Sequence, residues 1–124
     1  DMPVVAEFLP IDGNYTPEMV AHWARLGFEL GADVIKTLYT GDVASFARVV
    51  MGCGLPVLIA GGPMVGTEAD LLRTVSQAIE GGAAGTAIGR RVWQSRDPTA
   101  LLALFAHLVH GTRRLDQVLA MLQV

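Results

Sequence analysis

The sequence predicts an α/β fold built from parallel βα units, and three observations lead to this prediction. Short apolar runs alternate along the chain with longer segments of helical periodicity. The runs are apolar on successive residues, as expected for strands that are covered on both faces. The composition, with 52% hydrophobic residues, 14 glycines and few aromatic residues, suits packed βα units better than a sandwich or a disordered tail.

The first βα unit has the clearest boundaries. Thr16 is an expected N-cap, Pro17 suits the first helical position, and Glu18 places an acid in the first turn. The helix that they begin should run to about Leu30 and stop at Gly31. The expected strands of the four units are residues 3–9, 33–39, 56–60 and 85–88.

The later helices have start signals of the same kind. Asp42 is expected to be the N-cap of the second helix rather than a proton donor. Thr67 and Asp70 come close to a capping box, although the usual partner is Glu or Gln. Asp97, followed by proline, should begin another helix, and a further helical segment is expected over residues 112–122.

The 124 residues should form a single domain. Four βα units are half of the eight in a closed βα barrel, which typically needs about 250 residues. Local propensity does not separate half of such a barrel from an open four-stranded sheet with helices on both faces. The chain opens directly on a strand-like run, which suggests a piece of something longer.

Composition argues against several function classes. A formal net charge of −3 and scattered arginines leave no basic stripe for nucleic acid. No signal segment opens the chain and no apolar run approaches the ~20 residues of a membrane span, so we expect a cytoplasmic protein with no membrane association. Cys53 is the only cysteine, so an intrachain disulfide is excluded. Cys53 is expected to lie in a turn. We expect no metal site and no cofactor.

The only lysine, Lys36, lies inside the second apolar run, whereas eight arginines carry every other strong positive side-chain charge. Arginine keeps its proton, but a desolvated lysine amine loses it and becomes a nucleophile. Covalent chemistry with a carbonyl compound is therefore one interpretation. The alternative is a lysine whose stem covers apolar surface while its charged group stays in water.

The carboxyl ends of the strands are where either architecture would place a binding site. Glu7 and Lys36 lie near the ends of the first two strands, and Gly61 with Gly62 follows the third. Gly89 and Arg90 follow the fourth. Glycine has no side chain, so its backbone amide can approach an anion closely, and a guanidinium group can donate two parallel hydrogen bonds to the same anion. The last two strand ends together therefore indicate a phosphate site.

Three segments in register resemble the class I, Schiff-base aldolases. They are GADVIKTLYTGD (residues 31–42), PVLIAGG (56–62) and AIGRRVWQ (87–94), and they cover nearly the whole chain in the family's order. More narrowly, they resemble the carboxyl-terminal half of the archaeal-type fructose-bisphosphate aldolases and of the related aminodideoxyheptulosonate synthases. The resemblance implies the carboxyl-terminal half of a (β/α)8 TIM barrel.

The resemblance also implies roles for individual residues. Lys36 corresponds to the lysine that forms the Schiff base with a phosphorylated keto sugar. The substrate phosphate would be held by Gly61, Gly62, Gly89 and Arg90. The expected function is a fructose-bisphosphate aldolase-like C–C bond cleavage or formation. The alternatives are a transaldol step of the heptulosonate type and a non-catalytic half-barrel that only binds phosphate.

The chain departs from the family pattern at several points. Leu9 precedes Pro10 where the fructose-bisphosphate enzymes have an acid/base tyrosine. Glu7 is the nearest ionisable substitute, and it could either act there or pair with Lys36 or Arg90. Arg91 replaces the asparagine usual in relatives and adds positive charge beside the phosphate loop. The amino-terminal half of the barrel is missing, so we expect self-association or pairing with such a half. Trp93, which follows the phosphate loop, is expected to be a core anchor rather than a substrate contact.

Overall fold

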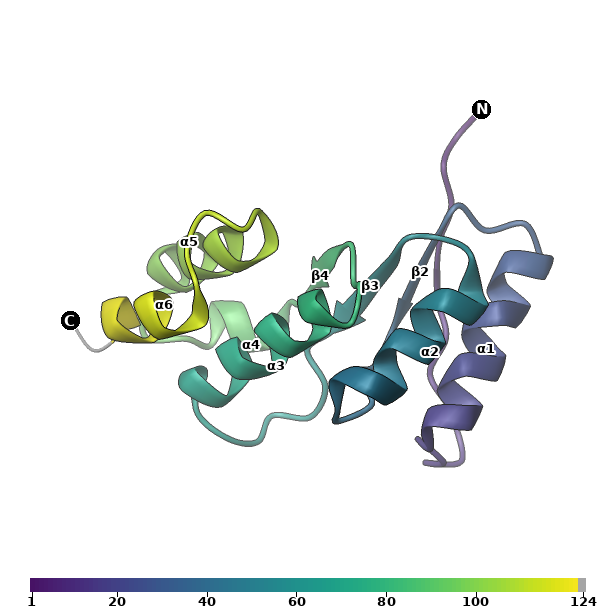
Figure 1. The fold of residues 1–124 in the computed structure, drawn as a ribbon, viewed down its shortest axis with the longest axis horizontal. Coiled ribbons are helices and arrows are strands. Elements are labelled where there is room, and N and C mark those ends of the chain that lie inside the picture. The colour runs from purple at the N-terminus through teal and green to yellow at the C-terminus, as the bar shows by residue number, and fades with distance from the viewer. Residues whose placement is uncertain (123–124) are drawn as a thin grey trace.

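The computed structural model of the chain describes residues 1–122. Helices and strands alternate as expected for successive βα units, and each strand lies within one of the apolar runs of the sequence (Figure 1). In chain order the elements are β1 (Val5–Glu7), α1 (Pro17–Glu29), β2 (Val34–Thr37), α2 (Val43–Cys53), β3 (Val57–Ala60), α3 (Glu68–Glu80), β4 (Gly85–Ala87), α4 (Arg90–Trp93), α5 (Pro98–Val109) and α6 (Leu115–Leu122).

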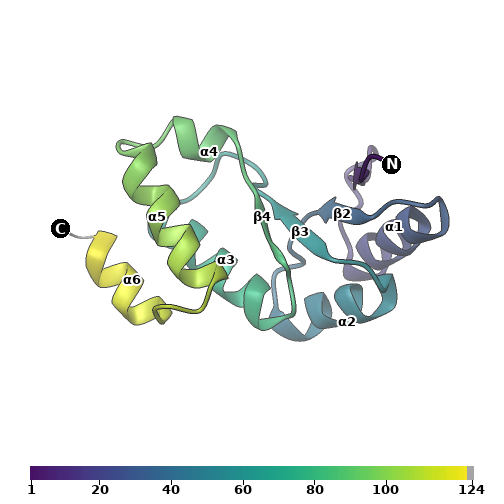
Figure 2. The same ribbon diagram turned by 90° about the horizontal axis from the view of Figure 1, so that it is seen from above.

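The four strands form one parallel sheet in the order β1-β2-β3-β4. Figure 2 shows α1, α2 and α3 along one side of this sheet. A doubly wound sheet reverses its strand order at a switch point and carries helices on both faces, whereas a βα barrel adds its strands in sequence beneath an outer layer of helices. The topology is therefore that of half a barrel, which confirms the predicted fold class.

The helices α1, α2, α3 and α5 begin where the sequence predicts, whereas α6 begins at Leu115 rather than near residue 112. Thr16, Asp42, Thr67 and Asp97 each accept a hydrogen bond from a backbone N–H in the first turn of the helix that follows. At α3 the box is complete, because the Asp70 carboxylate also accepts from the Thr67 backbone N–H at 2.9 Å. These bonds satisfy amide groups that the helix itself leaves unpaired, so each strand-to-helix connection ends at a defined residue.

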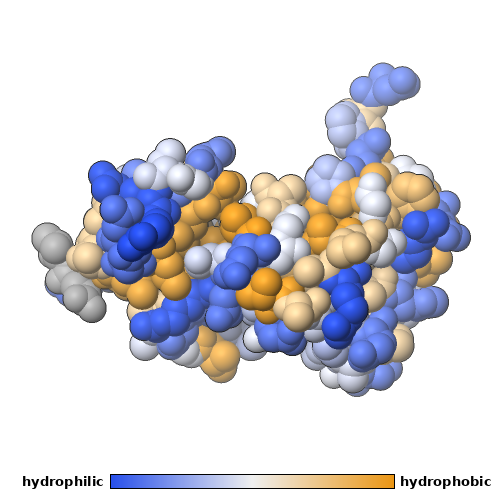
Figure 3. Space-filling model, in the orientation of Figure 1, coloured by the Kyte–Doolittle hydropathy of each residue, from blue (hydrophilic) through white to orange (hydrophobic). Residues whose placement is uncertain are grey.

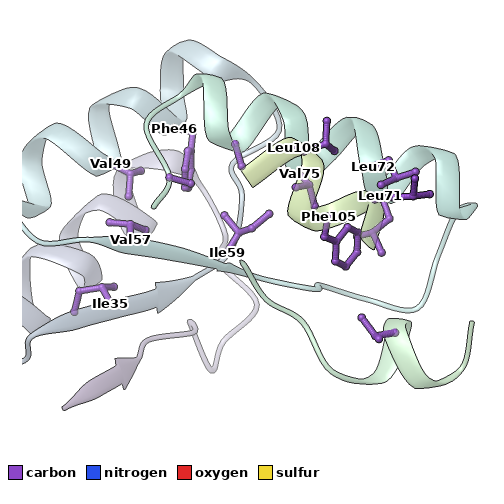
Figure 4. Close-up of a cluster of buried hydrophobic side chains, with 14 of the residues drawn as sticks. Ile35, Phe46, Val49, Val57, Ile59, Leu71, Leu72, Val75, Phe105 and Leu108 are labelled. Carbon is purple, nitrogen blue, oxygen red and sulfur yellow. The ribbon is translucent and has the colours of Figure 1, made fainter. Parts of the chain in front are cut away.

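The core has two connected parts, which Figure 4 shows. One lies between the sheet and the first helices, where Ile35, Val57 and Ile59 meet Phe46 and Val49. The other joins α3 to α5 through leucine, valine and phenylalanine side chains: Leu71, Leu72, Val75, Phe105 and Leu108. Outside these regions, on the face seen in Figure 3, hydrophilic and hydrophobic residues are interspersed. The buried side chains fix the helices on one side of the sheet.

The strand edges and the amino-terminal segment are less well covered. β1 and β4 each have only one neighbouring strand among the residues described. Val5, on β1, is 56% exposed, and the preceding Val4 and the following Leu9 and Ile11 are exposed as well. Exposed apolar residues along an unpaired strand edge favour association with another chain or segment.

One residue, Cys53, differs from its expected setting. Cys53 is the last residue of α2 rather than a turn residue, and its thiol is fully buried with the carbonyl of Ala24 as acceptor at 3.5 Å. Leu30, which shares the helical spacing of Trp23, is exposed at the end of α1, whereas Trp23 packs against Phe8 with ring centroids 6.3 Å apart. Across residues 1–122, the helices are too short or too polar for any of them to traverse a bilayer.

Candidate active site

Glu7 and Lys36 form an ion pair at the carboxyl ends of neighbouring strands. The register of β1 and β2 aligns the two residues, and Lys36 Nζ lies 3.1 Å from Glu7 Oε1. The Lys36 side chain is 25% exposed and the Glu7 side chain 46% exposed. The residues that alternate with them, Phe8 and Ile35, belong to the packed side of the sheet, so the pair lies on the opposite side. Of the possible partners considered for Glu7, Lys36 is the one with which it forms an ion pair.

Backbone and side-chain bonds hold the strand ends that carry this pair. The Phe8 N–H donates to the Lys36 carbonyl at 3.0 Å, and Thr37 Oγ1 donates to the Phe8 carbonyl at 3.0 Å. Thr37 is fully buried, and this hydrogen bond gives its hydroxyl group a partner in the protein interior. The separation between Glu7 and Lys36 is therefore fixed by the sheet and by a buried side chain.

The ion pair opens into a pocket of about 1030 Å³ at the carboxyl end of the sheet. Every residue that the sequence analysis assigned to a site lines this pocket: Glu7, Lys36, Gly61, Gly62, Gly89 and Arg90. The pocket thus joins a primary amine, a carboxylate, two glycine loops and a guanidinium in one space. Their roles remain predictions, but their proximity is a property of the fold.

The glycines lie where a side chain would not fit or would be strained. Gly62 has a φ of 66°, a conformation that L-residues with side chains rarely adopt. A Cβ at Gly61 would lie 2.9 Å from Ile88 Cγ2, and one at Gly89 would lie 2.9 Å from the Trp93 ring. The two loops therefore approach each other, and bare backbone faces the pocket from both of them.

Asp42 has the capping role that the sequence predicts. Its carboxylate accepts from the Ser45 backbone N–H at 2.8 Å and from Ser45 Oγ at 2.6 Å. These hydrogen bonds, that from the Ser45 side chain first, hold the pKa of Asp42 below its ordinary value. A carboxylate held in its ionised form by a helix cap is a poor proton donor.

The structure corrects the expectation for Trp93. It is 70% exposed and lines the pocket beside Gly89, so it is no core anchor in this chain. Trp93 ends the four-residue helix α4, which follows the turn at Gly89 and is too short to bury so large a ring.

Three further pocket residues were not selected from the sequence. Tyr15 lies in the connection after β1, and Asp70 is the capping carboxylate of α3. Tyr39 follows β2, and its hydroxyl donates to Gln77 Oε1 at 3.2 Å. Burial, followed by the nearby carboxylates of Asp42 and Glu80, raises the pKa of Tyr39. Tyr15 lies well outside any strand, so only its tertiary position relates it to the pocket.

Fold and site together define half of a βα barrel with a lysine-containing pocket at the carboxyl ends of its strands. The profile of the "DeoC/LacD family aldolase" matches residues 1–95. The chain belongs to this aldolase family.

Individual relatives agree with that assignment. The chain is 43% identical to the class 1 fructose-bisphosphate aldolase of Thermoproteus tenax, over 96% of this chain and 47% of that protein. It is 40% identical to 2-amino-3,7-dideoxy-D-threo-hept-6-ulosonate synthase 1 of Archaeoglobus fulgidus, over 95% of this chain and 44% of that one. A crystal structure of an archaeal fructose 1,6-bisphosphate aldolase superposes with a TM-score of 0.83 at 43% identity, covering 89% of this chain and 46% of the other. The chain spans about half the length of these relatives.

Proposed function

We propose that this chain contributes the Schiff-base half of a class I aldolase that acts on a phosphorylated keto sugar. The observation that carries the proposal is the Lys36–Glu7 pair, 3.1 Å apart, at the floor of a pocket that two glycine loops also line. One similar structure, 43% identical, is described as an aldolase with its catalytic lysine bound to the carbinolamine intermediate of the substrate. Lys36 is the only lysine of this chain.

In the proposed reaction, the uncharged Lys36 amine adds to the carbonyl carbon of the sugar. The resulting carbinolamine loses its hydroxyl group as water and leaves an iminium ion. The neighbouring C–C bond then breaks: the hydroxyl group on its far carbon gives its proton to the Glu7 carboxylate and becomes an aldehyde, while the electron pair of the bond moves toward the iminium nitrogen and forms an enamine. Glu7 is placed to take a proton from the Lys36 ammonium and to return it to the departing hydroxyl group. Leu9 cannot perform this proton transfer.

The proposed phosphate site consists of the loop at Gly61 and Gly62 and the turn at Gly89 and Arg90. Backbone amides of glycine-rich loops can approach an anion closely, and an exposed guanidinium adds charge-assisted hydrogen bonds. Loops after the last two strands of a βα barrel are a common phosphate site of that fold. This placement would hold the sugar phosphate at one end of the pocket and its carbonyl near Lys36.

The heptulosonate-type transaldol enzyme is the second candidate, because the relatives of that name are about as similar to this chain as the fructose-bisphosphate aldolase. With a complete barrel and fructose 1,6-bisphosphate, an aldolase would release both triose phosphates. An imine on Lys36 without that release would favour the transaldol enzyme.

We also propose that the uncovered side of the sheet pairs with a further set of βα units, either in a second copy or in an amino-terminal half. The exposed apolar residues of β1 support this. Light scattering over a range of concentrations tests pairing between copies. Val5→Lys should lower the paired fraction, whereas Met51→Lys, at an exposed position of α2, should leave it unchanged. A monomer at every concentration would exclude the second copy as the partner.

Reductive trapping tests the imine. The chain is incubated with dihydroxyacetone phosphate and borohydride, and its intact mass is measured. We expect one adduct on the parent chain and none on Lys36→Met. Glu7→Gln should slow adduct formation by about 100-fold, in the usual range for a lost acid–base group.

A matched control separates a specific imine from general amine chemistry. The double variant Lys36→Met/Arg73→Lys carries its one lysine on the exposed surface of α3, and it should form no adduct. An equal adduct on this control, or none on the parent chain, would contradict the catalytic proposal. Phosphate binding without any adduct would instead favour the non-catalytic half-barrel.

A further inference from the structure

Arg91 is held in a position that its sequence context did not suggest. Its Nη2 donates to the backbone carbonyl of Thr67 at 3.0 Å, across 24 residues of sequence. Thr67 ends the loop that contains Gly61 and Gly62, and Arg91 directly follows Arg90. The hydrogen bond therefore joins the two loops of the proposed phosphate site at the residues next to them.

A second bond joins the same two elements. Ser95, just after α4, donates its hydroxyl to Glu68 Oε1 in the first turn of α3. The same hydroxyl accepts from the Asp97 backbone N–H at 3.2 Å, at the start of α5. Ser95 and Glu68 are both half-buried, so water competes less for this bond than it would at an open surface.

The partners of these bonds are themselves fixed. Thr67 is the N-cap of α3, and the Asp70 carboxylate accepts both its backbone N–H, at 2.9 Å, and its hydroxyl, at 2.8 Å. At the other end of the loop, Gly61 lies against Ile88 so closely that a Cβ would be 2.9 Å from Ile88 Cγ2. The loop between Gly61 and Thr67 is thus anchored to the fourth βα unit at both ends.

We infer that Arg91, together with the Ser95–Glu68 pair, is a clasp that sets the spacing of the two phosphate loops. Both arginines line the pocket. In this arrangement Arg90, which is exposed, is the guanidinium that meets the anion, whereas Arg91, which is less exposed and is bonded to Thr67, is a positioning residue. The inference rests on the proposed phosphate site. It reassigns Arg91, whose replacement of asparagine appeared from the sequence to add only charge beside the loop.

The test measures binding of inorganic phosphate to the full chain by calorimetry, in parallel with reductive trapping. The variants are Arg91→Ala, Ser95→Ala and Glu68→Gln. Arg91→Ala and Ser95→Ala should each weaken phosphate binding by about threefold to tenfold, which corresponds to the loss of one hydrogen bond. Ser95 carries no charge and lies outside the pocket lining, so its effect would be one of position.

Glu68→Gln is the matched control. Glutamine keeps an oxygen that accepts from the Ser95 hydroxyl, and the substitution removes a negative charge near the anion. Phosphate should therefore bind this variant as tightly as the parent chain, or more tightly. Trapping of unphosphorylated dihydroxyacetone on Lys36 should be unchanged in all three variants, whereas trapping of dihydroxyacetone phosphate should weaken in Arg91→Ala and Ser95→Ala.

Each contrary result has a distinct meaning. Loss of phosphate binding in Arg91→Ala but not in Ser95→Ala would identify Arg91 as a direct ligand and overturn the clasp. An equal loss of trapping with both ketones would show general damage to the fold and overturn it too. A parent chain that traps dihydroxyacetone but binds no phosphate would overturn the phosphate site and, with it, the clasp, while leaving the imine proposal in place.

Discussion

Gly27 is the point at which α1 contacts the strands of the proposed catalytic pair, and its substitution tests that packing. It is buried on the helix, and a Cβ there would lie 2.3 Å from Ile35 Cδ1 and 2.8 Å from Phe8 Cε2. Ile35 is fully buried and has little room to yield. Phe8 and Ile35 are the chain neighbours of Glu7 and Lys36, so Gly27→Ala must displace side chains that pack against the strands of the ion pair.

Two effects of Gly27→Ala oppose each other. Overpacking of a core typically costs about 1–3 kcal/mol, and the short contacts here put the cost near the upper end. Alanine returns about 1 kcal/mol because it favours the helix over glycine. The free energy of unfolding should therefore fall by about 2 kcal/mol, measured by urea denaturation.

Gly52→Ala is the control for the helical effect alone. Gly52 lies in α2 with no atom within 4 Å of its would-be Cβ, so this substitution should raise the free energy of unfolding by up to about 1 kcal/mol. If Gly27→Ala proved as stable as Gly52→Ala, the close contact between α1 and the sheet would not exist as described.

The remaining predictions concern the helix caps. Thr67→Ala removes one half of the capping box at α3 and should lower the free energy of unfolding by about 1 kcal/mol, whereas Thr99→Ala, at an exposed position in the first turn of α5, should change it little. Asp42 should make stability depend on pH in a particular direction. Because hydrogen bonds from Ser45 lower the pKa of Asp42 from 3.8, its stabilisation is complete above that pH and is lost as the pH falls through the folded-state pKa. Asp42→Asn keeps a capping oxygen but removes the charge. The difference in melting temperature between the parent chain and the variant should therefore be constant near neutral pH and become smaller in acid. A difference that grew in acid would contradict this.

The sequence determines much of the fold because the signals are local. The caps at Thr16 and Asp42 depend on side chains that bond within three residues, so they can be predicted from spacing alone. The strand order could not be predicted in this way. Whether four βα units form half a barrel or an open sheet depends on which side each crossover helix packs, and that is decided by contacts between residues far apart in the sequence, such as Phe8 and Gly27.

The site likewise has features that could be predicted from the sequence and features that depend on tertiary contacts. Parallel strands bring their carboxyl ends to one edge, so Lys36 and the glycine loops could be assigned to a common pocket from the sequence. The partner of Glu7 could not, because it follows from the register that aligns Glu7 with Lys36. The role of Arg91 was also hidden, since its acceptor is a backbone carbonyl 24 residues away and no sequence pattern marks such a bond.

The exposure of the Lys36–Glu7 pair links the chemistry of the site to the cover of the sheet. In water an ammonium and a carboxylate are each well solvated, and an ammonium can attack a carbonyl only after it has lost its proton. Further βα units over the open side would remove that water, and desolvation disfavours both charges of the pair. Under the proposed function, the rate of trapping should therefore rise with the fraction of chain that is paired.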